Sequence, residues 1–143
     1  MEPLCLSVKR LHKDATLPTK AHPGDAGWDI YSLDITEVPA WGSRLVSTGI
    51  ALSIPYGWCG IIKDRSSVAL KQDTTTNAGV IDHGYTGELK VLLRNNSPQI
   101  KWLNAGDRIA QLLLIPVPEV TLVEVDSFEE TDRGEGGFGS SGR

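Results

Sequence analysis

The sequence predicts an all-β fold, a closed barrel or a jelly roll, with one short helix. Two observations predict it. Some nine or ten short stretches are apolar or alternate between apolar and polar residues, and turn residues separate them at regular intervals. The length of 143 residues suits a single domain, and 40% hydrophobic residues are enough to build a core. No internal repeat is visible.

The strands expected in the first half are short and end at turns that contain glycine or proline. Residues 4–11 carry apolar side chains at positions 4, 6, 8 and 11, close to the period-two pattern of a half-buried strand. A loop at residues 18–27 precedes a strand at residues 28–32. Further strands are expected at residues 44–54, with a bulge at Gly49, and at residues 58–63, with turns at residues 39–42 and 55–57.

Residues 64–71 form the one helix-like stretch. Asp64 or Ser66 can cap its start, and Ala69, Leu70 and Lys71 favour helix. Hydroxyl groups and free amides at the start of a helix make a natural phosphate site. The same residues also make an ordinary helix cap, so the local sequence leaves both interpretations open.

A hairpin is expected at the centre of the chain. Val80 and Ile81 lead to Asp82 at a tight turn, where Gly84 supplies a positive φ, and a strand follows at residues 88–95. With Tyr85 beside the acid, this hairpin could form the floor of a pocket. The alternative is a surface turn in which Asp82 only caps the backbone.

The second half completes the strand set with residues 99–103, 108–116 and 119–125. Turns are expected at residues 95–98 and 104–107. Ile109 and residues 112–115 form a nearly continuous apolar run, which is typical of a strand buried on both faces. In the first half, Asp29 lies among bulky neighbours and needs a partner, as a structural anchor or as a support for a site.

The last eleven residues differ in kind from the rest. Residues 133–143 are too rich in glycine to contribute a core, so we expect a β domain at residues 1–132 and a mobile flap after it. Gly134, Gly136 and Gly139 match the spacing of a dinucleotide fingerprint, but no helix follows and no βαβ unit surrounds them, so this match is rejected. A disordered tail is the alternative to a flap.

Charge and cysteine content limit the partners and the compartment. The chain has 14 Lys and Arg against 18 Asp and Glu, a net charge of −4 and no basic run, so no nucleic-acid surface is expected. Cys5 and Cys59 form no CxxC pair and are expected as free thiols in a reducing compartment. No stretch has the length of a signal-peptide core or a bilayer span. We expect a soluble intracellular protein, in the cytoplasm or nucleus, without membrane partners.

Five segments, in the same order, resemble those of the homotrimeric dUTPases, the deoxyuridine triphosphate nucleotidohydrolases. One such segment would be weak, whereas five in register over nearly the whole chain are specific. They are Ala26-Gly27-Trp28-Asp29-Ile30, Arg65-Ser66-Ser67-Val68-Ala69, Gly79-Val80-Ile81-Asp82 with Tyr85 and Gly87, Gly106-Asp107-Arg108-Ile109-Ala110-Gln111, and Arg133-Gly134-x-Gly136-Gly137-Phe138-Gly139-Ser140-Ser141-Gly142.

The resemblance implies a distorted jelly-roll subunit, three subunits around a threefold axis, and active sites shared at their interfaces. It implies hydrolysis of dUTP to dUMP and pyrophosphate by attack of water on the α-phosphate, with Mg²⁺ held mainly by the triphosphate and waters. Such an enzyme limits uracil in DNA and supplies dUMP for dTMP synthesis. In this family Asp82 would activate the water, and Tyr85 would exclude a 2′-hydroxyl.

The remaining site residues follow from the same resemblance. Supporting positions fall on Asp29, Arg65 and Asp107. The residues implied to lie around the uracil are Asn77, Gly79, Val80, Ile81 and Lys90. Those implied to bind the α- and β-phosphates are Arg65, Ser66, Ser67 and Gln111. The flap would contribute Arg133, Phe138, Gly139, Ser140 and Ser141, with Arg133 and the two serines binding the γ-phosphate and Phe138 covering the base.

Three positions depart from the common pattern of the family. Gly84 replaces an acidic residue, Ser67 replaces a glycine, and Glu135 replaces a small hydroxyl residue. Each could alter affinity, and none removes a catalytic group.

Two other functions stay open at this point. The turn at His83 to Tyr85 also resembles that of the dCTP deaminases, but those enzymes need a glutamate where this chain has Leu92. A non-catalytic trimeric β-protein, such as a capsid-like or signalling module, is the second alternative. Pyrophosphate release from dUTP, with dCTP and UTP alongside, would distinguish them.

Overall fold

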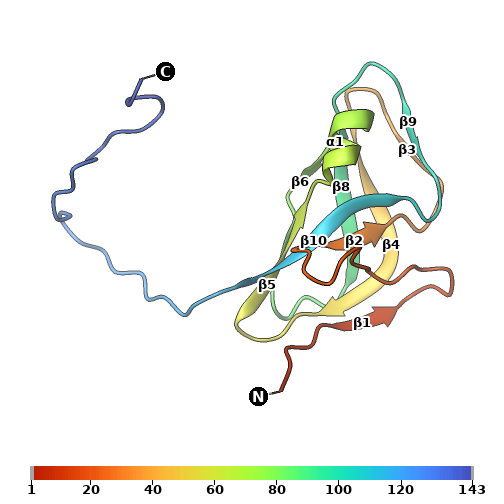
Figure 1. Cartoon of the computed structure of the whole chain (residues 1–143), viewed down its shortest axis with the longest axis horizontal. Helices are drawn as coiled ribbons and strands as arrows, with labels where there is room; N and C mark the ends of the chain where they lie inside the picture. Colours follow the sequence, from red (N-terminus) through yellow and green to blue (C-terminus); the bar gives the residue numbers. More distant parts are fainter. Residues whose placement is uncertain (1, 143) are drawn as a thin grey trace.

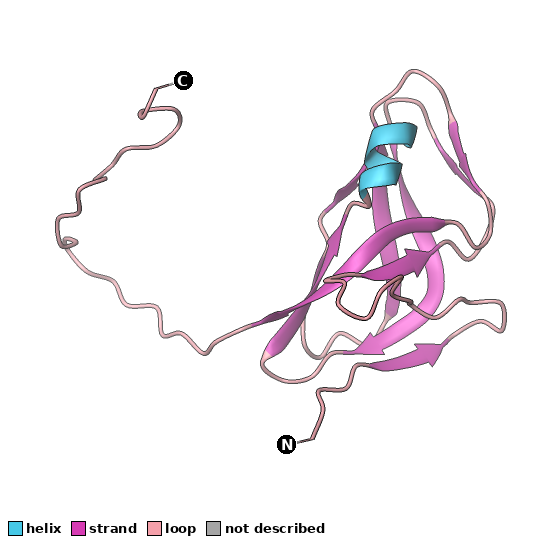
Figure 2. Ribbon diagram, in the orientation of Figure 1, coloured by secondary structure: helices cyan, strands magenta, loops and turns pink. Residues whose placement is uncertain are grey.

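The computed structural model describes residues 2–142 and confirms the all-β prediction (Figures 1 and 2). Ten strands and one helix lie within these residues. In chain order the elements are β1 (Ser7–Arg10), β2 (Trp28–Tyr31), β3 (Thr36–Val38), β4 (Ser43–Ser53), β5 (Trp58–Lys63), α1 (Ser66–Gln72), β6 (Thr74–Asn77), β7 (Val80–Ile81), β8 (Glu88–Asn95), β9 (Lys101–Leu103) and β10 (Arg108–Pro116).

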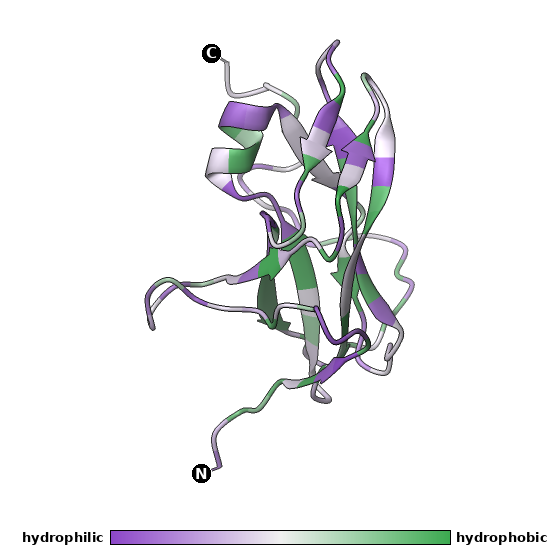
Figure 3. Cartoon of the chain, turned by 90° about the vertical axis from the view of Figure 1, so that its right-hand side faces the viewer, coloured by the Kyte–Doolittle hydropathy of each residue, from purple (hydrophilic) through white to green (hydrophobic). Residues whose placement is uncertain are grey.

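Two four-stranded sheets and one two-stranded sheet make up the body. One sheet has the order β1-β4-β8-β6, the second has the order β2-β10-β5-β7, and β3 pairs with β9. In Figure 3 the hydrophobic colours concentrate along these strands. Neighbours in the sheets are distant in sequence, as in a jelly roll, so topology brings together residues that lie far apart in the chain.

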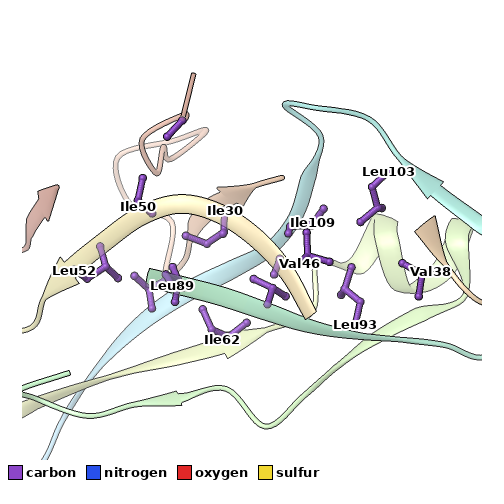
Figure 4. Close-up of a cluster of buried hydrophobic side chains, with 14 of the residues drawn as sticks. Ile30, Val38, Val46, Ile50, Leu52, Ile62, Leu89, Leu93, Leu103 and Ile109 are labelled. Atoms are coloured by element: carbon purple, nitrogen blue, oxygen red, sulfur yellow. The ribbon is translucent and has the colours of Figure 1, made fainter. Parts of the chain in front are cut away.

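The core lies where side chains of these sheets meet (Figure 4). Strand β8 shows the period-two rule most clearly, because Leu89, Val91 and Leu93 are buried while Lys90 between them is exposed. Ile30 from β2 and Ile109 from β10 belong to the same cluster. Burying each such side chain stabilises the fold by roughly 1.5–3 kcal/mol.

The expected central hairpin is wrong. Strand β7 pairs with β5, where Ile81 faces Gly60, whereas β8 pairs with β4 and β6. Residues 82–87 therefore cross from one sheet to the other. A tight turn with glycine looks the same in sequence whether it joins paired strands or strands of different sheets, and this explains the error.

The expected strand at residues 119–125 is also wrong. Residues 117–142 contain no strand or helix and extend away from the body (Figure 1). Val120, Leu122 and Val123 are exposed there. Alternating apolar residues form a strand only where a neighbouring edge accepts their backbone hydrogen bonds, and the described part of one chain offers none to this segment.

Strand β10 is buried less evenly than its apolar run predicts. Ile109, Ala110 and Leu112 are buried, but Leu113 and Leu114 are half-buried and Ile115 is exposed. The reason is its pairing: β2 covers β10 only from Arg108 to Leu112, and beyond that point β5 is its one partner among the described strands.

Several boundaries moved. The first strand is shorter than residues 4–11, and the strand expected at 99–103 begins at Lys101. Strands β3 and β6 were missed because both are short and polar. The bulge at Gly49 is confirmed by a register shift between Ser47 and Ala51 and by a φ of +72°.

The helix begins at Ser66, two residues inside the expected stretch of residues 64–71, and its cap differs from the expectation. Arg65 occupies the N-cap position without a capping side-chain hydrogen bond, so neither Asp64 nor Ser66 caps it. The Asp64 carboxylate instead accepts a hydrogen bond from the Thr76 amide at 2.5 Å. It ties the start of the helix to β6.

Cys5 and Cys59 are free, as expected. Within residues 2–142, the structure contains no helix with the length and apolar character needed to span a membrane.

Candidate active site

Asp82 lies at the end of β7, on the rim of a pocket of about 310 Å³. Five residues expected around the reacting substrate meet in this pocket, although the hairpin that was expected to hold them does not form. They are Val80, Ile81, Asp82, Tyr85 and Lys90, joined by Leu45 and Glu88. Strand β7 supplies the first two from one sheet, and β8 supplies Lys90 from the other.

Glycines give the backbone its path into this pocket. Gly79 has a φ of +110°, and its carbonyl accepts a hydrogen bond from the Ile62 amide at 2.8 Å. A Cβ at this position would lie 3.0 Å from the Ile62 carbonyl oxygen. Gly84, with a φ of +95°, turns the chain after Asp82, where the Tyr85 amide bonds the Asp82 carbonyl at 3.2 Å.

We expect Gly79→Ala to lower the free energy of unfolding by at least about 1 kcal/mol, because alanine is strained at this φ and its methyl group crowds Ile62. Thermal unfolding measures the change. Gly24→Ala is the matched control, since nothing lies within 4 Å of its added Cβ. Equal stability of the two variants would contradict the importance of this close approach.

Tyr85 is fixed across the loop that follows Asp82. Its hydroxyl donates to the Glu88 carbonyl at 2.8 Å. Gly87 leaves the space for the ring, because a Cβ there would lie 2.7 Å from the Tyr85 hydroxyl oxygen. The ring is therefore a rigid surface beside the acid rather than a freely rotating side chain.

A second group of expected residues gathers around Asp29. The Arg65 Nε lies 2.9 Å from one carboxylate oxygen of Asp29, and the Arg108 Nε lies 3.8 Å from the other. Asp29 is largely buried, so these two guanidinium groups compensate its charge. Asp29 is thus the anchor that holds Arg65 at the start of the helix.

Gln111 belongs to the same region. It pairs with Asp29 and Lys63 across β10, and its amide nitrogen donates to the Asp64 carbonyl at 2.8 Å. Ser66 and Ser67 are exposed at the first positions of the helix. Hydroxyl, amide and guanidinium donors therefore line one side of the body.

A basic pocket extends from this group. It is lined by Arg65, Ser67, Lys71, Asp107 and Arg108 among others. The Asp107 carboxylate accepts a hydrogen bond from the Asn104 amide at 2.8 Å, so its role is to shape the turn before β10. Lys71 and Arg108 received no role from the sequence, although Arg108 stands inside one of the five matching segments.

The other expected residues lie apart from both groups. Asn77 ends β6 opposite Leu92 and does not line the Asp82 pocket. The tail residues are exposed, and the Arg133 side chain donates only to the nearby Gly136 carbonyl among the described residues. Phe138 is fully exposed, with Gly139, Ser140 and Ser141 following it (Figure 1). In one chain the expected site is thus divided among three places.

Comparison with known proteins decides the family. The family model described as dUTPase matches residues 13–142. The chain belongs to the dUTPase family. The expectation drawn from the five segments is confirmed.

Two relatives of this dUTPase-family chain have the same name. The deoxyuridine 5′-triphosphate nucleotidohydrolase of Saccharomyces cerevisiae is 45% identical over 138 residues, which are 96% of this chain and 94% of that protein. The protein of the same name from Mycobacterium marinum is 46% identical over 145 residues, with 96% and 94% coverage.

Solved dUTPase structures share the fold. The dUTPase of Staphylococcus bacteriophage 80alpha, solved with dUpNHpp, superposes with a TM-score of 0.91 at 32% identity, covering 97% of this chain and 99% of that chain. A D95N mutant dUTPase from phage phi11 of S. aureus, described for its coordination of a structural Mg(II) ion, gives a TM-score of 0.80 at 29% identity, with 88% and 99% coverage.

Proposed function

We propose that this chain hydrolyses dUTP to dUMP and pyrophosphate, with Asp82 as the general base. The observation that carries the proposal is the pocket in which Asp82 and Tyr85 meet, within a chain of the dUTPase family. Relatives along nearly its whole length are named for this activity, and the 80alpha enzyme was solved with dUpNHpp.

The chemistry follows from the exposed carboxylate. Asp82 accepts a proton from one ordered water, the water oxygen bonds to the α-phosphorus, and the bond to the bridging oxygen of the leaving pyrophosphate breaks. A positioned general base of this kind contributes about 10²–10⁴-fold to the rate. The rest of the catalysis is positioning and charge stabilisation, as is usual for phosphoryl transfer.

Tyr85 selects the sugar. Its ring is fixed by the Glu88 carbonyl and by the space at Gly87, so it cannot move away from a 2′-hydroxyl. The backbone of residues 79–81 and the strand at Lys90 border the same pocket and would hold the uracil. A fixed polar rim discriminates between bases because a wrong base leaves its amides unpaired.

We expect Tyr85→Ala to lower the ratio of kcat/KM for dUTP over UTP while preserving the preference for uracil over cytosine. Removal of the ring opens space at C2′ without touching the backbone that reads the base. Steady-state rates with dUTP, UTP and dCTP give both ratios. An unchanged sugar ratio together with a lost base preference would assign Tyr85 the wrong role.

The phosphates are proposed to bind at the start of α1. Arg65, Ser66, Ser67 and Gln111 supply the donors, and Asp29 holds Arg65 in place. This group does not share a pocket with Asp82 in one chain, and we propose that a complete site takes residues from more than one subunit. This separation supports a homotrimer whose sites are shared between subunits.

We propose that the substrate, rather than a set of protein side chains, binds Mg²⁺. Within residues 2–142 no group of three or more His, Cys, Asp or Glu side chains is arranged to hold a metal ion. Magnesium commonly binds through substrate phosphates and waters, so we propose that the triphosphate carries it into the site. When bound there, the ion would neutralise charge on the leaving pyrophosphate.

Pyrophosphate release from dUTP, measured beside dCTP, UTP and dTTP, tests the proposed function. We expect turnover with dUTP and rates at least about tenfold lower with the other nucleotides. Ammonia release from dCTP would instead indicate a deaminase. Leu92 stands opposite Leu45 and Asn77, where an alkyl side chain can transfer no proton. In a cell this activity would limit uracil in DNA and supply dUMP for dTMP synthesis.

A further inference from the structure

A second pocket, which does not include Tyr85, also reaches Asp82. Its volume is about 280 Å³, and its lining includes Tyr56, Cys59, His83 and Glu119. These residues come from the turn before β5, from β5 itself, from the loop after β7, and from the chain that leaves β10 toward the tail. None of them has a role in the substrate contacts described above.

Two contacts, a hydrogen bond and an aromatic contact, fix the ring of His83. Its Nδ1 lies 2.7 Å from the Ile54 carbonyl oxygen, and because a carbonyl can only accept, Nδ1 carries the hydrogen and donates. The ring also stands edge-on to Tyr56, with centroids 5.5 Å apart and planes at 86°. The residue is exposed, but its ring is fixed.

Tyr56 connects the loop that carries His83 to the first residues of the tail segment, which follows β10. Its hydroxyl donates to the Glu119 carboxylate, and that hydrogen bond, with a smaller contribution from burial, raises the pKa of Tyr56. Beside it, the Val117 amide donates to the Gly57 carbonyl at 2.7 Å. The start of the tail segment and the loop after Asp82 therefore share one aromatic side chain.

Asp82 needs such support. Within residues 2–142 no donor bonds its carboxylate, so the direction of that carboxylate depends on the backbone that carries it. Gly84, with a φ of +95°, turns the backbone just beyond Asp82. The neighbouring residue His83 ties the turn to the end of β4 through Ile54, while Tyr85 ties it to β8 through Glu88.

We propose that His83 is a positioning residue for Asp82, and that Tyr56 links the His83 ring to the start of the C-terminal segment at Glu119. The inference rests on the proposed function, in which Asp82 is the base. Release of the His83 ring lets the carboxylate turn away from the attacking water while the contacts to the uracil and the phosphates stay unchanged. Release of Tyr56 acts through the same ring.

Kinetics of His83→Ala, Tyr56→Ala and the double variant test the inference. Each single variant is expected to lower kcat for dUTP about tenfold with KM within twofold of wild type, since misplacement of a catalytic group lowers turnover rather than binding. The double variant should be no slower than the slower single variant, because both remove one contact. His22→Ala, a histidine remote from the pocket, is the control and should leave kcat unchanged.

A second readout does not depend on activity. Cys59 lines the pocket and is half-buried, so in a Cys5→Ser background its reaction rate with a thiol reagent reports whether the pocket is closed. The rate should rise in Tyr56→Ala and stay close to wild type in His22→Ala. Tyr56 is 72% exposed, so its truncation should leave the thermal unfolding midpoint nearly unchanged even where His83→Ala destabilises the fold.

The outcomes separate this inference from the proposed function. An inactive Asp82→Asn enzyme together with kcat within twofold of wild type in both His83→Ala and Tyr56→Ala would overturn the positioning role alone. The positioning role would also be overturned if the fold decrease in kcat of the double variant equalled the product of the two single decreases. Wild-type turnover in Asp82→Asn would overturn the proposed function, and the inference with it.

Discussion

Asp82→Asn is expected to lower kcat for dUTP by about 10²–10⁴-fold, because an amide cannot accept the proton of the attacking water. The fold should survive, since the Asp82 side chain is exposed and supports no described ion pair. Binding of a non-hydrolysable dUTP analogue should change little, as the residues that hold the base, sugar and phosphates are intact.

Pyrophosphate release and calorimetric binding of the analogue check this result. Asp14→Asn is the matched control, because its carboxylate is 69% exposed and lies outside both groups of site residues. Turnover of Asp82→Asn near that of Asp14→Asn would remove Asp82 from the catalytic role.

The second large effect concerns the tail. Truncation after Asp132 removes Arg133 and Phe138 and should abolish most activity, because we propose that these residues cover the γ-phosphate and the base. On one chain the segment after β10 extends away from the body (Figure 1). The segment from residue 117 onward has no helix or strand, so its reach is up to roughly 3.3–3.6 Å per residue, enough to cross a subunit interface.

Mixing tests whether the tail acts on another subunit. Asp82→Asn and the truncated chain are each expected to be nearly inactive, but refolded together they should form trimers in which some sites take Asp82 from one parent and Arg133 with Phe138 from the other. Activity should then reappear. Mixed trimers confirmed by native mass spectrometry but without activity would show that the tail serves its own subunit.

The parts that could be predicted from sequence are those with local causes. Alternation in β8 places Leu89, Val91 and Leu93 in the core whatever the strand pairs with, and Gly49 permits the positive φ of a bulge in β4. Asp82 and Tyr85 share a pocket because they are three residues apart on one turn. Both results need little knowledge of the rest of the fold.

The parts that could not be predicted depend on partners. Nothing near Val80 says that β7 pairs with β5 rather than with β8. Nothing near Asp64 says that Thr76 takes its carboxylate away from the helix cap. The apolar residues at 119–125 alternate as they would in a strand, but this pattern does not show whether a neighbouring strand edge is available to pair with them. Nothing near His83 says that Ile54 and Tyr56 fix its ring.

The most direct test of the central claim is the fate of the water oxygen. Hydrolysis of dUTP in ¹⁸O-labelled water, followed by mass spectrometry of both products, reports which phosphorus is attacked. Attack on the α-phosphate at the Asp82 site predicts one ¹⁸O atom in dUMP and none in pyrophosphate. Label in pyrophosphate, or formation of dUDP in place of dUMP, would contradict the account.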